Sequence, residues 1–149
     1  MSAASSDLTA ILARASEKSR EALLQAEDEA QAWLEGVRSG AWSADKECVI
    51  CGRGGKMEDN HIAGWRHGDL TVPMCPPDHR EFTEGQDLWD PRWQDRQGTP
   101  ELNESLLLRG LVDLLRLKAR HVPDALVGAY LALASSLREQ YVRVGRRTI

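Results

Sequence analysis

The chain has 149 residues, of which 42% are hydrophobic and 28% charged, and its net charge is −4. That length suffices for one domain with its own core, and the composition excludes an intrinsically disordered chain. No signal-peptide pattern and no run of about 18 apolar residues occurs, so we expect a cytoplasmic protein without a membrane-spanning segment. Residues 41–100 carry seven Lys and Arg against eleven Asp and Glu, whereas residues 101–149 carry eight against five. The acidic middle argues against a strong DNA binder acting alone.

Residues 1–40 are predicted to form one long amphipathic helix, from about Ser6 to Arg38. Ala, Leu, Glu and Gln are frequent in this segment, and all four favour helix. Apolar and small residues recur at three- and four-residue steps and form one narrow stripe, made of Leu8, Leu12, Ala15, Ser19, Ala22, Ala26, Ala30, Trp33 and Val37. We expect the stripe to pack on the C-terminal helices of the same chain. Self-association through this face, or docking of another protein on the helices, is the alternative.

Residues 41–98 contain all three cysteines of the chain, which predicts a metal-binding module. An odd and low cysteine count argues against disulfides, whereas a C-x-x-C pair followed by glycines is typical of a zinc knuckle. Cys48 and Cys51 form that pair, and Cys75 supplies a third thiolate. Zinc needs a fourth donor, which is Asp78 if the second half repeats the C-x-x-C spacing and His79 if the spacing loosens by one residue. The module is predicted to hold a structural zinc ion.

Residues 99–149 are predicted to form a helical hairpin that breaks at Pro123. The first helix starts at Pro100 and is apolar over more than half its circumference, which is typical of a buried helix. The second runs from about Asp124 to Val144, with an apolar face formed by Leu126, Tyr130, Leu133, Leu137 and Tyr141.

Two further predictions concern aromatic and histidine residues of the middle segment. Trp89 and Trp93 are expected to cover the small zinc core against the helices, although tryptophan rings can also stack on bases. His67 is expected to be exposed in a loop between two strands.

The segment from Cys48 to Thr83 resembles the HNH, or ββα-metal, endonucleases that embed their catalytic motif in a treble-clef-type zinc finger. The resemblance is carried by the runs from Glu58 to Gly64, from Thr71 to Cys75 and from Asp78 to Arg80. Asn60 stands where a metal-binding Asp or His is usual, and Asp78 takes the place of the fourth zinc cysteine. The helical flanks are not covered by the resemblance.

The resemblance implies a β-hairpin followed by a helix and a role for each matching residue. His61 would act as general base in DNA phosphodiester hydrolysis, while Asn60 and His79 would hold a catalytic Mg²⁺ or Mn²⁺. Arg66 and Arg80 would contact the nucleic acid.

The sequence therefore predicts a mainly α fold, in which a small ββα zinc-binding module lies between a long N-terminal helix and a C-terminal hairpin. Two functions stay open. The chain is either an HNH-type endonuclease or a non-catalytic zinc protein that serves as an adaptor in a larger protein or nucleoprotein assembly.

Overall fold

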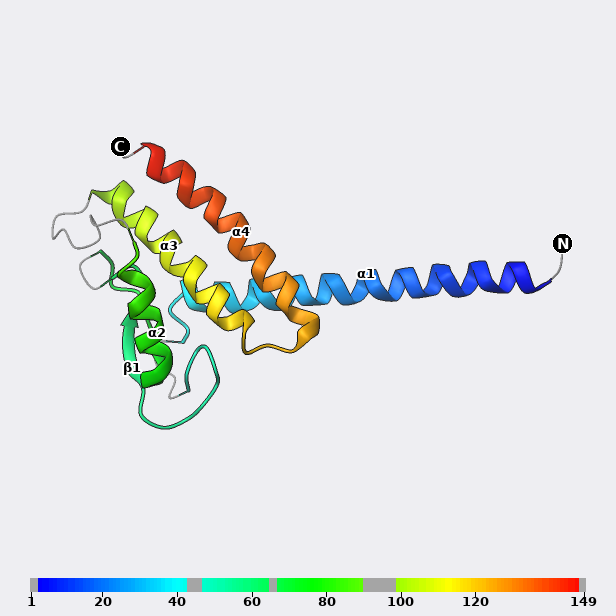
Figure 1. Ribbon diagram of the computed structural model, residues 1–149, viewed down its shortest axis with the longest axis horizontal. Helices are drawn as coiled ribbons and strands as arrows, with labels where there is room; N and C mark the ends of the chain where they lie inside the picture. Colours follow the sequence, from blue (N-terminus) through cyan, green and yellow to red (C-terminus); the bar gives the residue numbers. More distant parts are fainter. Residues whose placement is uncertain (1–2, 43–46, 65–66, 90–98, 148–149) are drawn as a thin grey trace.

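The fold is mainly helical with one small sheet, as a computed structural model covering residues 3–42, 47–64, 67–89 and 99–147 shows. The elements are α1 (Ala3–Arg38), β1 (Glu58–His61), β2 (Thr71–Met74), α2 (Pro76–Gln86), α3 (Pro100–Ala119) and α4 (Asp124–Arg147). Figure 1 shows α3 and α4 as a hairpin, with one end of α1 beneath it and the small β-hairpin and α2 at one side. This arrangement confirms the predicted long N-terminal helix and C-terminal hairpin. None of the helices in the described ranges is long and apolar enough to cross a bilayer.

The hairpin of α3 and α4 forms the centre of the core. The α3 helix begins after Thr99, whose side-chain oxygen accepts a hydrogen bond from the Leu102 amide at 3.2 Å, and Pro100 occupies the first turn. Its buried residues are Ser105, Leu106, Leu108, Gly110, Leu111, Val112, Leu114, Leu115 and Ala119. They cover several faces of the helix, which explains why α3 packs against α4, α2 and the sheet region at the same time.

Only the last third of α1 packs on the body of the chain. Trp33 makes an edge-to-face contact with Tyr130 of α4, at 5.8 Å between ring centroids, and Leu34 and Val37 are fully buried. Every residue from Asp7 to Gln25 is exposed. The prediction that the whole stripe packs on the C-terminal helices is therefore wrong for its exposed part, from Leu8 to Ala22. At 1.5 Å per residue α1 is about 54 Å long and α3 about 30 Å, so α1 extends beyond the hairpin (Figure 1).

The two strands form an antiparallel hairpin in which Glu58 pairs with Met74 and His61 with Thr71. A two-stranded sheet is marginal by itself and needs a covering layer. That layer comes from α2, through the buried Phe82, and from α3, which approaches the end of β1 at Gly110. The sheet, α2 and the hairpin thus share one core.

Candidate metal centre and neighbouring pocket

The metal-binding residues come from a tight turn and from the start of α2. In the turn, the Gly52 amide donates to the Cys48 carbonyl at 2.9 Å, and Gly52 has a φ of 75°, a conformation that glycine adopts without strain. The Val49 amide donates to the Pro73 carbonyl at 2.9 Å, which fixes the turn beside β2. Cys75 is the N-cap of α2, and Asp78 lies in the first helical turn.

Cys48, Cys51, Cys75 and Asp78 converge, with one ligand atom from each lying within 4.8 Å of all the others. The Asp78 Oδ2 atom lies 3.2 Å from Cys48 Sγ and 3.1 Å from Cys75 Sγ. Cys51 Sγ lies 3.7 Å from Cys75 Sγ. A tetrahedral zinc ion with its usual bond lengths separates two sulfurs by about 3.8 Å and a sulfur from an oxygen by about 3.5 Å. The four side chains are therefore spaced to bind one metal ion such as zinc. Among the described residues, no second group of three or more His, Cys, Asp or Glu side chains brings its ligand atoms this close together.

The two candidates for the fourth donor point in different directions. Asp78 is buried among the sulfurs, whereas His79 Nδ1 lies 2.5 Å from Glu58 Oε2 on β1. Neighbouring residues of a helix differ by about 100° in direction, so only one of the two can face the cysteines. The structure places Asp78, and not His79, with the three sulfurs.

The surroundings of the cluster set its protonation. Burial raises the pKa of the Cys75 thiol to about 12. Burial alone would also raise the pKa of Asp78, but hydrogen bonds from Cys75 and Cys48 outweigh it and hold that pKa below its usual value. Lys118 of α3 donates from Nζ to the Ile50 carbonyl at 3.1 Å. Its positive charge beside the knuckle can offset the negative charge of a thiolate-bound metal.

These protonation states predict that zinc binding strengthens as the pH rises through neutrality. The pKa values of Cys75 and Cys51 are both raised by burial, so their thiols keep their protons at neutral pH in the metal-free chain. Zinc binds the thiolate and must displace those protons, which compete more strongly at lower pH. Isothermal titration calorimetry in buffers of different ionisation enthalpy should show proton release on zinc binding. A binding enthalpy that is independent of the buffer would contradict this prediction.

A separate pocket lies between β1 and the other side of α2. It is lined by Asp59, Asn60, His61, Gly64, His79, Thr83 and Gln86. The three residues for which the HNH resemblance implies a catalytic role therefore share one pocket. Asn60 is nearly fully buried, and its amide lies 3.5 Å from Met74 Sδ. Gln86 donates to the His61 carbonyl at 3.5 Å, which ties α2 to the end of β1.

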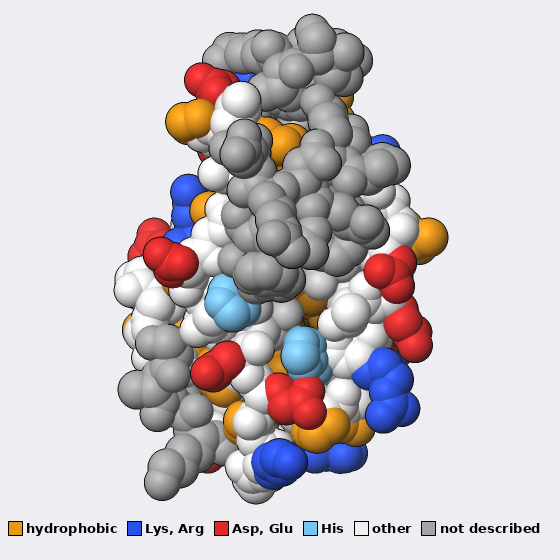
Figure 2. Space-filling model, turned by 90° about the vertical axis from the view of Figure 1, so that its left-hand side faces the viewer, with side chains coloured by type: hydrophobic (Ala, Val, Ile, Leu, Met, Phe, Trp, Pro, Cys, Tyr) orange, Lys and Arg blue, Asp and Glu red, His pale blue; other side chains and the backbone are white. Residues whose placement is uncertain are grey.

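Among the described residues that line this pocket there is an aspartate and no Lys or Arg. Asp59 lines the pocket, and the carboxylate of Glu58 contacts the ring of His79. Figure 2 shows two histidine side chains exposed on this end of the molecule, with acidic side chains beside them and most of the visible basic side chains nearer the edges. Arg80 is exposed on α2 but does not line the pocket. Arg66 lies outside the described residues.

The predicted roles of His67 and Trp89 have different outcomes. The prediction of an exposed His67 is wrong, because the side chain is buried and its Nδ1 lies 2.8 Å from Asn103 Oδ1. This contact attaches the loop between the strands to α3. Trp89 is buried as expected, packs edge-to-face on Phe82 and donates to Asp113 at 2.8 Å. Trp93 lies outside the described residues.

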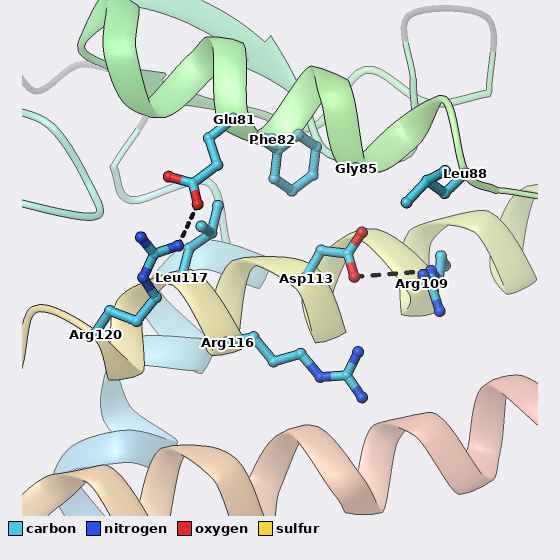
Figure 3. Close-up of a pocket in the computed structure, with 9 residues that line it drawn as sticks. All are labelled: Glu81, Phe82, Gly85, Leu88, Arg109, Asp113, Arg116, Leu117 and Arg120. Carbon is cyan, nitrogen blue, oxygen red and sulfur yellow. Dashed lines mark hydrogen bonds and ion pairs between the residues drawn. The ribbon is translucent and has the colours of Figure 1, made fainter.

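A third hollow, between α2 and α3, carries no comparable chemistry (Figure 3). Arg120, the C-cap residue of α3, reaches across it to Glu81 of α2 and forms an ion pair. Arg109 and Asp113 face each other along α3, with Nε and Oδ1 3.7 Å apart. Since these charged groups are paired across or along its walls, we interpret this hollow as the seam between the two helices.

Comparison of the chain with family models, with curated proteins and with solved structures found no match. The site must therefore be interpreted from its own residues. Sequence reasoning missed two of them, Glu58 as the partner of His79 and Lys118 beside the knuckle. Neither has a local signal, because 21 residues separate Glu58 from His79 and 68 separate Lys118 from Ile50.

Proposed function

We propose that this chain is a zinc-stabilised, HNH-like endonuclease that hydrolyses DNA phosphodiesters with His61 as general base. The observation that carries the proposal is the convergence of His61, Asn60 and His79 on one open pocket, apart from the Cys48–Cys51–Cys75–Asp78 cluster. A zinc ion in that cluster would have a structural role, since three thiolates and a carboxylate leave no open coordination position.

The contact between Glu58 and His79 supports a metal-binding role for the histidine. When Nδ1 donates its proton to a carboxylate, the lone pair of Nε2 is free to bind a metal, and the ring is held in one orientation. His79 and Asn60 would then hold a Mg²⁺ or Mn²⁺ ion, which supplies charge neutralisation at the phosphate when bound. His61 is partly exposed in the same pocket, so its imidazole can take the proton of an attacking water.

The test is cleavage of supercoiled plasmid and single-stranded DNA by the zinc-loaded chain with Mg²⁺, Mn²⁺ or Ni²⁺. His61→Ala should lower the rate at least about 100-fold, because a general base contributes that much or more to a hydrolytic rate. His121→Ala is the matched control, since His121 is exposed in the turn between α3 and α4, away from the pocket. All proteins must carry equal zinc. Equal cleavage by both variants, or no cleavage by the native chain, would refute the proposal.

Replacement of Glu58 tests the proposed metal-binding role of His79, which Glu58 contacts. Glu58→Gln retains the size of the side chain but removes the carboxylate that orients His79, and partners of this kind usually change metal affinity or activity about 10- to 100-fold. We expect the Mn²⁺ concentration for half-maximal cleavage to rise by a similar factor. Glu84→Gln on the exposed side of α2 is the control. An unchanged Mn²⁺ requirement would exclude this role for Glu58.

The second candidate is a non-catalytic zinc protein that acts as an adaptor. It is favoured by the acidic lining of the pocket and by the burial of the Asn60 amide against Met74. A nuclease needs positive charge near the scissile phosphate, and the described basic residues of the module, among them Arg53, Lys56 and Arg80, do not line the pocket. Absence of cleavage at full zinc content would favour this candidate.

A further inference from the structure

The exposed part of α1 forms a projecting arm, which we define as residues 7–25. Every side chain of the arm is exposed, and five are large and apolar: Leu8, Ile11, Leu12, Leu23 and Leu24, at 53% to 61% exposure. Nineteen residues of helix span about 28 Å, and Figure 1 shows the arm extending away from the rest of the chain. A helix of this length gains little stability from its own hydrogen bonds in water, so packing against a partner would stabilise it substantially.

The apolar face of the arm continues an interface that the chain already uses. Leu8, Leu12, Ala15, Ser19 and Ala22 follow one another at alternating four- and three-residue steps. The same face then runs into Ala26, Ala30, Trp33 and Val37, which are buried against the body of the chain. One stripe is therefore covered at its C-terminal end and uncovered along the arm. Steps of this kind are typical of the seam between two helices.

We propose that the arm pairs with the arm of a second copy of this chain in antiparallel orientation. The size of the stripe residues favours this orientation, since the large residues, Leu8 and Leu12, come first and the small ones, Ala15, Ser19 and Ala22, follow. Antiparallel pairing places each leucine against a small residue of the other copy, so the helix axes stay evenly spaced. Parallel pairing would set leucine against leucine at one end and alanine against alanine at the other, which leaves a gap.

The sizes of the stripe residues also fix the register of the pair. Matching both leucines with small residues sets residue 8 opposite residue 19 of the other copy and residue 12 opposite residue 15. Leu8 then faces Ser19 and Leu12 faces Ala15, and each pair occurs twice by symmetry.

The charged residues of the arm favour a second copy of this chain as its partner. Asp7 and Lys18 are eleven residues apart and lie on the same flank of the helix. Antiparallel pairing places the same flank of both copies together and brings Asp7 of each copy near Lys18 of the other, whereas parallel pairing would place this flank against the opposite flank of the partner and lose the contact. The arm carries three acidic residues (Asp7, Glu17, Glu21) and three basic ones (Arg14, Lys18, Arg20), so it has no net charge to attract nucleic acid or an anionic membrane.

The test is the association state of the zinc-loaded full chain, measured by sedimentation equilibrium. We expect a dimer, and the double variant Leu8→Glu with Leu12→Glu should raise its dissociation constant at least about 30-fold, because central apolar contacts of an interface are worth that much. The fold should survive, since both leucines are exposed. Leu24→Glu is the matched control, because Leu24 is equally exposed but lies on the far side of the helix from the stripe.

Charge reversal tests the orientation. Asp7→Lys should weaken the dimer, and adding Lys18→Asp should restore it, since the pair is then reversed but still complementary. A native chain that stays monomeric at about 100 μM would overturn the proposal. So would equal weakening by Leu24→Glu, or binding of the arm to phosphatidylserine vesicles in place of dimerisation. A failure of the second substitution to rescue the first would overturn the antiparallel arrangement.

Discussion

Removal of zinc is expected to unfold residues 48–86 while much of the α3–α4 hairpin stays helical. The β-hairpin has two strands of four residues and the loop before it from Gly52 to Lys56 is exposed, so strand pairing alone is marginal, and the packing of this segment on α3 depends on a metal that ties the turn to α2. Structural zinc sites contribute on the order of 10 kcal/mol to the folding of comparable small modules. Hydrogen exchange with and without chelator measures the effect. Amides of β1, β2 and α2 should lose protection, and those at the centre of α3 should retain most of theirs.

Substitution of the fourth donor tests the site more sharply than chelation. Asp78→Ala leaves three thiolates and should weaken zinc binding at least about tenfold, whereas Asp78→Cys completes a four-cysteine site and should strengthen it. His79→Ala is the control, because the side chain at that position faces Glu58. It should retain full zinc in a competition assay with a chromophoric chelator. Loss of zinc from His79→Ala, with zinc retained by Asp78→Ala, would reassign the donor.

The sequence predicts most of the helical fold because periodicity reports burial directly. In α3, Leu111, Leu114 and Leu115 are fully buried, as their pattern indicates. The stripe of α1 shows where periodicity stops being informative, since it describes a face that can be covered but not what covers it. The same steps are buried at Ala30 and exposed at Leu12, because α1 crosses the hairpin only at its C-terminal end (Figure 1).

For the site, the sequence predicts the residue types and leaves the directions open. The spacing of Cys48 and Cys51 identifies a metal knuckle, since two thiolates at that distance along the chain reach one ion. It does not choose between Asp78 and His79, because the choice depends on which side of α2 faces the turn. The prediction for His67 is wrong for a related reason, since its partner, Asn103, comes from a helix 36 residues away.

The metal centre and the pocket are coupled through α2. Asp78 and His79 are neighbours in its first turns, one facing the sulfurs and the other facing Glu58. A metal ion that fixes the start of α2 therefore also fixes the direction of His79 and of Gln86, which holds the carbonyl of His61. Loss of zinc should abolish any activity of the pocket even though no zinc ligand lines it. This coupling is why every comparison of pocket variants needs matched zinc content.

Replacement of Gly110 by alanine is expected to destabilise the chain by about 1–3 kcal/mol, although alanine favours helix by about 1 kcal/mol. A Cβ atom at this position would lie 2.0 Å from the carbonyl oxygen of Ile62 and 2.7 Å from its Cγ2. The nearest of these contacts is backbone, which cannot swing aside as a long side chain would. Either α3 moves away from the end of β1 or the Ile62–Ala63 peptide shifts. Thermal unfolding followed by circular dichroism measures the loss.

Gly128→Ala is the matched control, because it makes the same substitution at an exposed position of α4 where a Cβ meets nothing within 4 Å. It should raise the free energy of unfolding by up to about 1 kcal/mol, so the two variants shift stability in opposite directions. Since Ile62 follows His61 directly, Gly110→Ala should also impair cleavage more than its loss of stability explains, if the pocket is catalytic. Equal stabilisation by both substitutions would show that α3 does not approach the end of β1 as closely as described, and the positions of His61 and Gln86 would then need revision.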